Sequence, residues 1–230
     1  MRRLILWDID GTLLSADGAG RNAVRDALVE VFGTTGPIGG YSFAGRTDPE
    51  IVRYLMRGAG FADADIDARM PELFRRYVTK LEREIVNADV TPLPGVPELV
   101  DRMEAAGGEV VLGMLTGNVR DGARIKVDAA GLGFDRFRVG AFGSDHADRP
   151  ELPAIAARRA RELVGVEFTG KEIVIIGDTP LDVACGRHLG VRTVAVATGK
   201  HPVDELAACD PDHVFADLAD VDAAWAAIVG

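Results

Sequence analysis

The stretch "LILWDIDGTLLS", residues 4–15, decides the fold of this chain and poses a chemical problem. Its first four residues form a continuous apolar run, which is typical of a strand that is buried on both faces of a sheet. The run ends in two aspartates, Asp8 and Asp10, with one residue between them and Gly-Thr after them. Because like charges repel in an apolar setting, the two carboxylates need a cation between them or two separate tasks.

Further apolar runs rich in β-branched residues follow along the chain. With the first run they predict strands over residues 3–7, 109–117, 138–145, 172–178, 191–198 and 213–218. Amphipathic segments between them predict helices over residues 97–107, 119–131, 151–165, 180–190, 202–209 and 219–229. This alternation predicts an α/β fold in which right-handed crossovers build a Rossmann-like parallel sheet.

Residues 16–89 break the alternation. They contain no convincing strand and three helical stretches, at residues 21–33, 48–60 and 65–86. In the first of these, Val24, Leu28, Val31 and Phe32 share one face at helical spacing, which indicates a small helical core. The proline-rich residues 91–97 indicate the return linker. We therefore expect an α/β core domain of residues 1–15 and 90–230, with an all-helical cap domain of residues 16–89 inserted after the first strand.

Composition limits the possible partners and compartment. A formal net charge of −10 argues against a nucleic-acid partner, because non-specific binding to nucleic acid needs a basic surface. The apolar run near residue 5 is far too short for a signal core or a membrane span. Cys185 and Cys209 lack metal-ligand spacing and are interpreted as reduced thiols. We expect a cytoplasmic protein without a membrane partner, and the oligomeric state stays open.

Polar residues follow four of the predicted strands, at the edge where open parallel sheets bind their ligands. These are Asp8 and Asp10; Thr116, Gly117 and Asn118; Asp145 and Arg149; and Asp178 and Asp182. Several of them could alone be turn residues or helix caps. Their shared edge makes a functional site the better interpretation. Carboxylates without histidine or cysteine favour a hard cation, and we expect Mg²⁺.

The motifs "WDIDGTLL", "LTGN", a downstream basic residue and "IIGDTPLD" resemble the four ordered motifs of the haloacid dehalogenase superfamily. The helical insert matches the cap that many members carry, and the branch with phosphoglycolate phosphatase and β-phosphoglucomutase is the most similar. The resemblance implies a Mg²⁺-dependent phosphatase. Its substrate would be a small phosphate monoester, similar to phosphoglycolate or a sugar phosphate, hydrolysed through an aspartyl-phosphate.

The resemblance also implies roles for the aspartates. Asp8 is the expected nucleophile, and Asp10 is the expected general acid for the leaving alkoxide and then the base that activates water. Mg²⁺ would bind a carboxylate oxygen of Asp8, the backbone carbonyl of Asp10, and Asp178. Thr12, counted among the phosphate-binding residues, is expected to bond to Asp10 and orient it. Asp182 is expected to hold metal-bound waters or Asp178.

The second and third motifs supply the remaining groups of the core. Thr116 resembles the hydroxyl that bonds a phosphate oxygen, and the amides of Gly117 and Asn118 at a helix start are expected to add an anion site. The third motif is usually a lysine. The segment "DRPELP" aligns best with it and places Arg149 there, and a guanidinium suits carboxylate and phosphate partners. Lys126, on the helix after "LTGN", is the alternative.

The insert is expected to set specificity. Arg46 in "FAGRTDPEI" and Arg21 after "GAG" are candidates for binding a substrate anion, and the cap should pivot near residues 15–20 and 88–94.

A β-phosphoglucomutase-like phosphomutase is the main alternative to a phosphatase, because it would share every core motif. A haloacid dehalogenase would need neither Asp10 nor Mg²⁺, and an inactive regulatory homologue should have eroded motifs.

Overall fold

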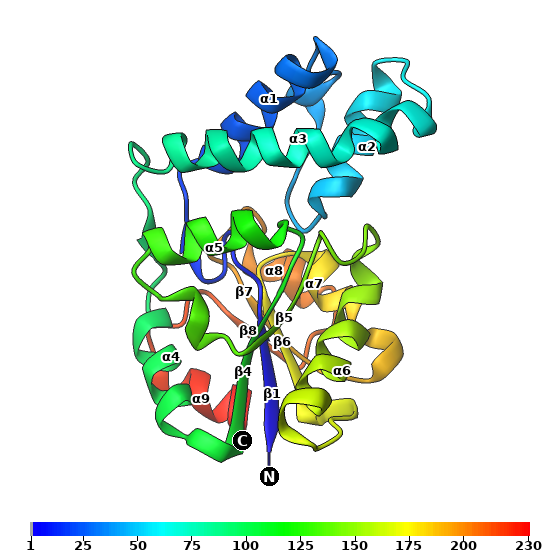
Figure 1. Ribbon diagram of the computed structural model, residues 1–230. Helices are drawn as coiled ribbons and strands as arrows, with labels where there is room; N and C mark the ends of the chain where they lie inside the picture. The colour runs from blue at the N-terminus through cyan, green and yellow to red at the C-terminus, as the bar shows by residue number, and fades with distance from the viewer. Residues whose placement is uncertain (1) are drawn as a thin grey trace.

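The computed structural model describes residues 2–230. They form a six-stranded parallel sheet, with a group of helices beyond the carboxyl ends of its strands (Figure 1). The strand order is β5-β4-β1-β6-β7-β8. The strands are β1 (Arg3–Trp7), β4 (Val110–Thr116), β5 (Val139–Phe142), β6 (Ile173–Gly177), β7 (Arg192–Val196) and β8 (His213–Phe215). Each predicted strand is present, and the parallel α/β class is confirmed.

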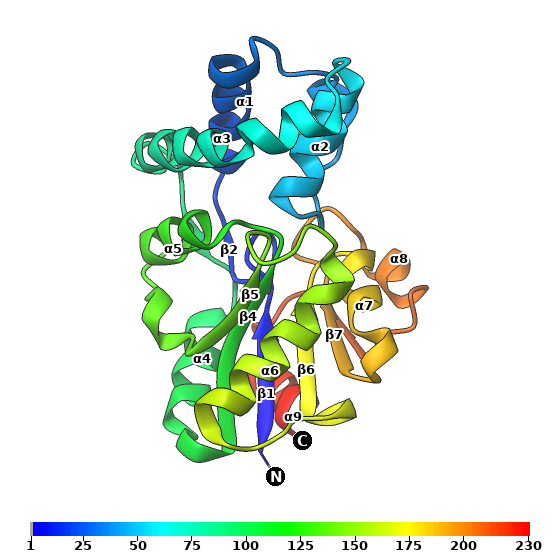
Figure 2. The ribbon, with the colours of Figure 1, turned by 45° about the vertical axis from the view of Figure 1, so that its right-hand side comes forward.

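Side chains of β1 alternate between two apolar layers, as the pleat of a strand requires. Ile5 and Trp7 pack on the face that is covered by α4 (Val96–Ala105), α5 (Arg120–Ala129) and α9 (Val221–Val229). Leu4 and Leu6 pack on the opposite face with α6 (Leu152–Val164) (Figure 2). Both faces of the sheet are therefore buried, which explains why its strands are continuous apolar runs rather than alternating ones.

The helical insert has a hydrophobic core of its own. It contains α1 (Ala19–Phe32), the short 3-10 helix η1 (Ile38–Gly40), α2 (Asp48–Gly58) and α3 (Asp63–Glu84). Val24, Leu28 and Phe32 are buried in this core and Val31 packs against it, as the spacing predicted. The chain enters and leaves through a short antiparallel pair, β2 (Leu14–Ser15) with β3 (Thr91–Pro92). Strands this short leave no periodic pattern, so the sequence did not predict them.

The remaining elements include one predicted helix that is shorter than expected. Residues 180–190 form α7 (Pro180–Cys185) and then a separate 3-10 helix, η6 (Arg187–Leu189), with Gly186 between them. The helices not yet named are η2 (Gly107–Glu109), η3 (Phe134–Arg136), η4 (Arg149–Glu151), η5 (Gly170–Glu172) and α8 (Val203–Ala207). Within residues 2–230, no helix combines the length and the apolar character that crossing a bilayer requires.

The order of the strands creates a crevice at the carboxyl end of β1. The chain runs from β1 to β4 and β5 on one side, and then crosses to β6 on the other side. Open α/β sheets bind ligands where the strand order reverses in this way. The amide of Asp8 extends the β1–β6 ladder with a bond of 2.9 Å to Ile176 O, while Thr116 ends β4. Asp8, Thr116 and Asp178 therefore reach the same crevice.

Candidate active site

A cavity of about 420 Å³ lies between the carboxyl edge of the sheet and the helical insert. Predicted site residues that line it are Asp8, Asp10, Thr116, Gly117, Asn118, Arg149, Asp178, Arg21 and Arg46. Lys126, Asp48, Tyr77 and Lys200 also line it. Thr12 and Asp182 do not line the cavity, but each contacts a residue that does: Asp178 and Arg149, respectively. The structure thus brings the strand-end residues and the two cap arginines around one space.

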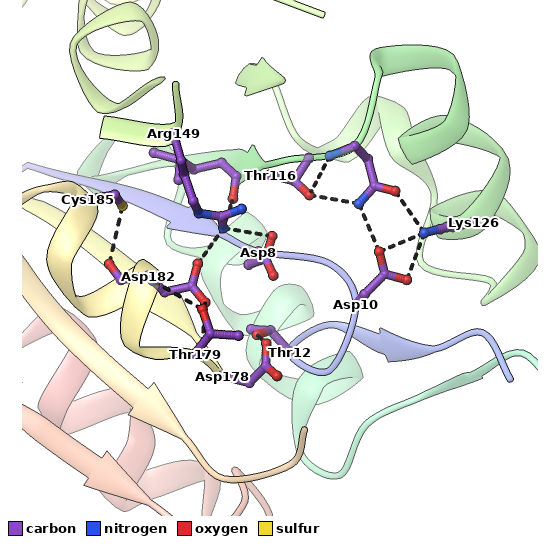
Figure 3. A network of polar contacts seen from close by, with 12 residues as sticks. Asp8, Asp10, Thr12, Thr116, Lys126, Arg149, Asp178, Thr179, Asp182 and Cys185 are labelled. Carbon is purple, nitrogen blue, oxygen red and sulfur yellow. Dashed lines mark hydrogen bonds and ion pairs between the residues drawn. The ribbon is translucent and has the colours of Figure 1, made fainter. Parts of the chain in front are cut away.

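On the Asp8 side, a buried guanidinium joins two carboxylates. Arg149 is 4 % exposed, and its Nη2 lies 3.1 Å from Asp8 Oδ1 while also contacting Asp182 Oδ1 (Figure 3). The second oxygen of Asp182 accepts bonds from Thr179, at 3.0 Å from N and 2.6 Å from Oγ1. Asp182 is part of the capping box of α7, so the start of that helix holds the residue that orients Arg149.

The carboxylates on this side fit a hard divalent cation. Oxygens of Asp8, Asp178 and Asp182 lie within 4.8 Å of one another, and all three residues are buried. Burial, with the nearby charges of Asp182 and Asp8, raises the pKa of Asp178 to about 8. Burial also raises the pKa of Asp8 to about 6, although the Arg149 charge opposes this. The single positive charge of Arg149 does not balance the charges of these three carboxylates. Because both oxygens of Asp182 are engaged, Asp8 and Asp178 are the pair best suited to bind the cation.

The prediction that Thr12 orients Asp10 is wrong. The Thr12 hydroxyl donates to Asp178 Oδ1 at 3.2 Å. Gly11 adopts φ +86°, and the amides of Thr12 and the next residue both donate to Ile9 O, so the turn folds Thr12 back towards the end of β6. Thr12 therefore steadies a candidate cation ligand rather than the expected acid–base residue.

Two other carboxylates have partners that the sequence did not predict. Among the described residues, Asp182 has no hydrogen bond to Asp178, because Arg149 and the amide and hydroxyl of Thr179 occupy its oxygens; its contact with metal-bound waters stays a prediction. Asp145, at the end of the third strand, pairs with Arg159 at 2.6 Å and does not line the cavity.

On the Asp10 side, a lysine and an amide hold the second carboxylate. Lys126 Nζ lies 2.8 and 2.6 Å from the two oxygens of Asp10 and 2.7 Å from Asn118 Oδ1. Asn118 Nδ2 donates to Asp10 Oδ2 at 2.8 Å. Desolvation in the cavity beneath the cap works against ionisation of Asp10, but the Lys126 charge and the hydrogen bonds of Lys126 and Asn118 hold its pKa below the ordinary value. Asp8 and Asp10 therefore face different partners in one cavity (Figure 3).

The structure gives Arg149 and Lys126 separate positions. Arg149 contacts Asp8, whereas Lys126 contacts Asp10, and the assignment of Arg149 to the third motif stays a prediction. Lys126 is 4 % exposed and lies among the buried residues Gly122, Ala123 and Val127 of α5. A lysine at an apolar position of an amphipathic helix was the sequence signal for a buried ion pair.

The structure corrects the predicted anion site for the Asn118 amide, whereas the role of the Gly117 amide stays a prediction. The Asn118 amide donates to Thr116 Oγ1 at 3.3 Å, and the helix begins only at Arg120. Asn118 acts instead through its side chain, which bonds to Asp10 and, at 2.9 Å, to Thr116 Oγ1. Because the Thr116 hydroxyl accepts both bonds from Asn118, its own proton can point to a ligand oxygen.

The two cap arginines line the cavity with their guanidinium groups held by the cap itself. Arg21 donates to Tyr41 O at 3.2 Å and lies 4.4 Å from the centre of the Phe43 ring. Arg46 pairs with Glu50 and lies 5.1 Å from the centre of the Tyr41 ring. Their contact with a substrate anion stays a prediction. Sequence reasoning missed Asp48, Tyr77 and Lys200, because "TDPE" indicates only a helix start and the other two show no motif.

Comparison with known proteins gives the family. The model of the haloacid dehalogenase-like hydrolase family matches residues 5–187. The chain belongs to this family. The phosphoglycolate phosphatase of Caulobacter vibrioides is 30 % identical to this hydrolase over 169 residues, covering 71 % of this chain and 68 % of that protein. Protein CbbY of Rhodobacter capsulatus is 24 % identical over 219 residues, covering 90 % of this chain and 91 % of that protein.

A solved structure agrees with this assignment at the level of the fold. The crystal structure of a hydrolase from Pseudomonas syringae superimposes on this hydrolase with a TM-score of 0.74 and 21 % identity, over 100 % of both chains. The resemblance that the four motifs predicted is confirmed, and with it the enzyme class: a hydrolase whose relatives are named phosphatases.

Proposed function

We propose that this hydrolase is a Mg²⁺-dependent phosphatase that cleaves small phosphate monoesters through an aspartyl-phosphate on Asp8. One observation carries the proposal: Asp8 and Asp10 line the same cavity but have opposite environments. Asp8 lies with Arg149 beside the candidate cation ligand Asp178, while Asp10 lies with Lys126. Paired carboxylates with different environments can act as a nucleophile and as an acid–base group in one reaction.

Asp8 and Asp178, together with the backbone carbonyl of Asp10, would hold the Mg²⁺. When bound, the ion supplies charge neutralisation between an anionic nucleophile and an anionic phosphoryl group, and helps to position that group. The burial of the carboxylates and the excess of negative charge beside Arg149 support this assignment.

In the first half of the reaction, a carboxylate oxygen of Asp8 forms a bond to phosphorus while the bond to the ester oxygen breaks. Asp10 gives its proton to that leaving oxygen. The Arg149 guanidinium beside Asp8 and the Thr116 hydroxyl bind the phosphoryl oxygens. In the second half, Asp10 takes a proton from water, and the resulting hydroxide oxygen displaces Asp8 from phosphorus to give inorganic phosphate. Lys126 favours the carboxylate form of Asp10 that this second step requires, so the first step draws on the minor, protonated form of Asp10.

A short anionic substrate suits the cavity. Its volume of about 420 Å³ is small, Arg21 and Lys200 add positive charge beyond the reacting centre, and Arg46, paired with Glu50, also lines it. Phosphoglycolate or a sugar phosphate has the size and charge for this space, and a relative with 30 % identity is named phosphoglycolate phosphatase. We further propose that residues 16–89 work as a cap domain on a core of residues 1–15 and 90–230, with the β2–β3 pair at its hinges.

A phosphate-release assay tests the function. Purified protein with Mg²⁺ is given phosphoglycolate, sugar phosphates and nucleotides. We expect release from at least one ester, loss of release after chelation, and recovery when Mg²⁺ is restored. Asp8→Asn should lower kcat by about 10⁴-fold or more, since losing a nucleophile removes the chemical step. Asp145→Asn, which alters an acidic residue outside the cavity, is the matched control.

Two results would contradict the proposal. Hydrolysis by Asp8→Asn at the wild-type rate would remove Asp8 as the nucleophile. Isomerisation of a sugar phosphate without net release of phosphate would identify a phosphomutase instead.

A further inference from the structure

The beginning of cap helix α2 is seated on the loop that leads into core helix α5. The Asp48 amide donates to Gly117 O at 2.8 Å, and Asp48 Oδ2 accepts from the Val119 amide at 2.8 Å. Beside these bonds, the Thr47 hydroxyl donates to Ala147 O. Thr47 is fully buried and Asp48 is 8 % exposed. The contact is therefore a buried, hydrogen-bonded junction between elements far apart in the sequence.

The Asp48 carboxylate supplies a group that α5 lacks. Val119 stands at the N-cap position of α5, and its amide is the group that an N3 side chain accepts from in a capping box; N3 of α5 is Gly122, which has no side chain. Helix starts leave unpaired amides that need such an acceptor. Helix α2 has its own cap, because the Thr47 hydroxyl accepts from the Glu50 amide at 3.2 Å. The Asp48 carboxylate, although it belongs to the cap, is therefore available to accept a bond from the core helix α5.

Helix α5 presents one face to the cap at several points. Val119, Gly122 and Lys126 follow one another at spacings of three and four residues, which places them on one side of the helix. Tyr77 of α3 packs so closely over Gly122 that a Cβ there would lie 3.0 Å from its ring. Helix α5 lies directly beneath α3 (Figure 1). At the far end of this face, Lys126 reaches Asp10.

Resting on the proposed function, we propose that Asp48 is a positioning residue for the acid–base group. Its carboxylate fixes the start of α5, and the rigid helix then fixes Lys126 against Asp10. Gly117 supports this close seating, because the Arg46 carbonyl leaves no room for a Cβ at that position. The cap segment that covers the substrate thereby also sets the geometry of proton transfer.

The leaving group of the substrate separates this role from a merely structural one. An alkyl phosphate such as phosphoglycolate needs a proton on its leaving oxygen, whereas p-nitrophenyl phosphate, with a good leaving group, needs it less. With saturating Mg²⁺ and the full chain, Asp48→Ala should lower kcat/KM for phosphoglycolate by about 10- to 100-fold, because a small misplacement of a catalytic group has effects of this size. For p-nitrophenyl phosphate we expect a loss of no more than about threefold, because acid assistance contributes less there.

Two further variants complete the design. Asp48→Asn keeps an oxygen that can accept from Val119, so its kcat/KM for phosphoglycolate should stay within about threefold of the wild type. Asp220→Ala removes a comparable cap, the 3.0 Å bond from the Ala223 amide at the start of α9, at a helix away from the cavity. It should lower stability in the same way without changing either kcat/KM.

Hydrogen exchange gives a readout that does not depend on activity. Asp48→Ala should exchange faster than the wild type across residues 117–126, and Asp220→Ala should not. Unchanged exchange in Asp48→Ala would overturn the proposal, as would equal losses for the two esters or a loss in Asp48→Asn as large as in Asp48→Ala. If the wild type hydrolyses no phosphate ester, the proposed function fails, while the exchange comparison still decides whether Asp48 fixes α5.

Discussion

The two halves of the active site begin in the same short segment and are built on opposite principles. The Asp8 half is closed: Asp8, Arg149 and Asp182 are each no more than 5 % exposed, and their partners come from the α/β core. The Asp10 half is open: the Asp10 side chain is 47 % exposed, and its partner Lys126 lies on core helix α5, which packs against the cap. Burial raises the pKa of Asp8, while Lys126 holds that of Asp10 down.

In the proposed mechanism, this difference lets one motif supply two catalytic roles. Positions 8 and 10 carry the same side chain, so the assignment of roles depends entirely on the surroundings. The nucleophile needs a fixed place against the phosphoryl group and a cation, which suits the rigid end of a buried strand. The acid–base group must exchange protons with the leaving group and with water, which suits an exposed position facing the cavity.

Among the partners of the two aspartates, Arg149 is the one whose replacement should lower turnover the most. Arg149→Met removes the cation between Asp8 and Asp182 and leaves both carboxylates buried beside each other. We expect kcat to fall by about 10³-fold, the upper range for losing one preorganised electrostatic group. Stability should also fall by about 3 kcal/mol or more, because a buried ion pair has lost one partner. Steady-state kinetics and urea unfolding measure the two effects.

Arg159→Met is the matched control, since Arg159 forms a partly exposed pair with Asp145 outside the cavity. It should change kcat by less than about twofold, as surface pairs contribute little. Equal losses in the two variants would show that Arg149 has only a structural role.

The contrast was partly visible in the sequence. The apolar runs and the strand-end polar residues predicted the sheet and its crevice, because local periodicity and parallel topology together determine which residues meet there. The partners of Thr12 could not be predicted, because they depend on how the turn at Gly11 folds back. The bond from Asp48 to Val119 joins residues 71 positions apart, and no local pattern encodes it. Lys126 was the intermediate case: the sequence singled it out as the alternative basic residue, but predicted neither its burial nor its contact with Asp10.

Replacing Lys126 should have a smaller effect than replacing Arg149. Lys126→Met leaves the hydrogen bond from Asn118 to Asp10 in place but removes the charge that holds Asp10 as a carboxylate. We expect kcat to fall by about 10- to 100-fold, the range for general acid–base catalysis that is weakened but not abolished. KM for the phosphate ester should change less, because in the proposed mechanism Arg149 and Thr116 bind the phosphoryl group.

Lys171→Met removes another lysine–aspartate pair, that with Asp212 at 2.6 Å, on an exposed part of the core. This control should leave kcat unchanged. A larger loss of kcat in Lys126→Met than in Arg149→Met would reverse the assignment of the two halves, since it would make Lys126 the group closer to the reacting phosphorus.

Asp48→Asn should have the smallest effect on turnover, but it tests whether the buried Asp48 carboxylate lowers the stability of the protein near neutral pH. Burial raises the pKa of Asp48 to about 6 from 3.8, while Lys126 opposes and Asp10 adds to this shift. The folded protein therefore binds a proton at this residue more tightly than the unfolded chain does. Its contribution to stability is highest below about pH 4, falls as the pH rises to about 6, and stays low above that.

The asparagine variant lacks this titration, so its stability relative to the wild type should increase from pH 4 to pH 7 by about 2 kcal/mol, close to the free energy of a shift of this size. Urea unfolding at several pH values measures it, and Asp63→Asn on the exposed face of α3 should show a much smaller change. A flat difference would mean that Asp48 ionises normally in the folded state. If the variant gains stability and keeps its turnover, the hydrogen bond to α5 is the part of Asp48 that function needs. If turnover falls despite the gain, the negative charge beside Lys126 also contributes to positioning the acid–base half.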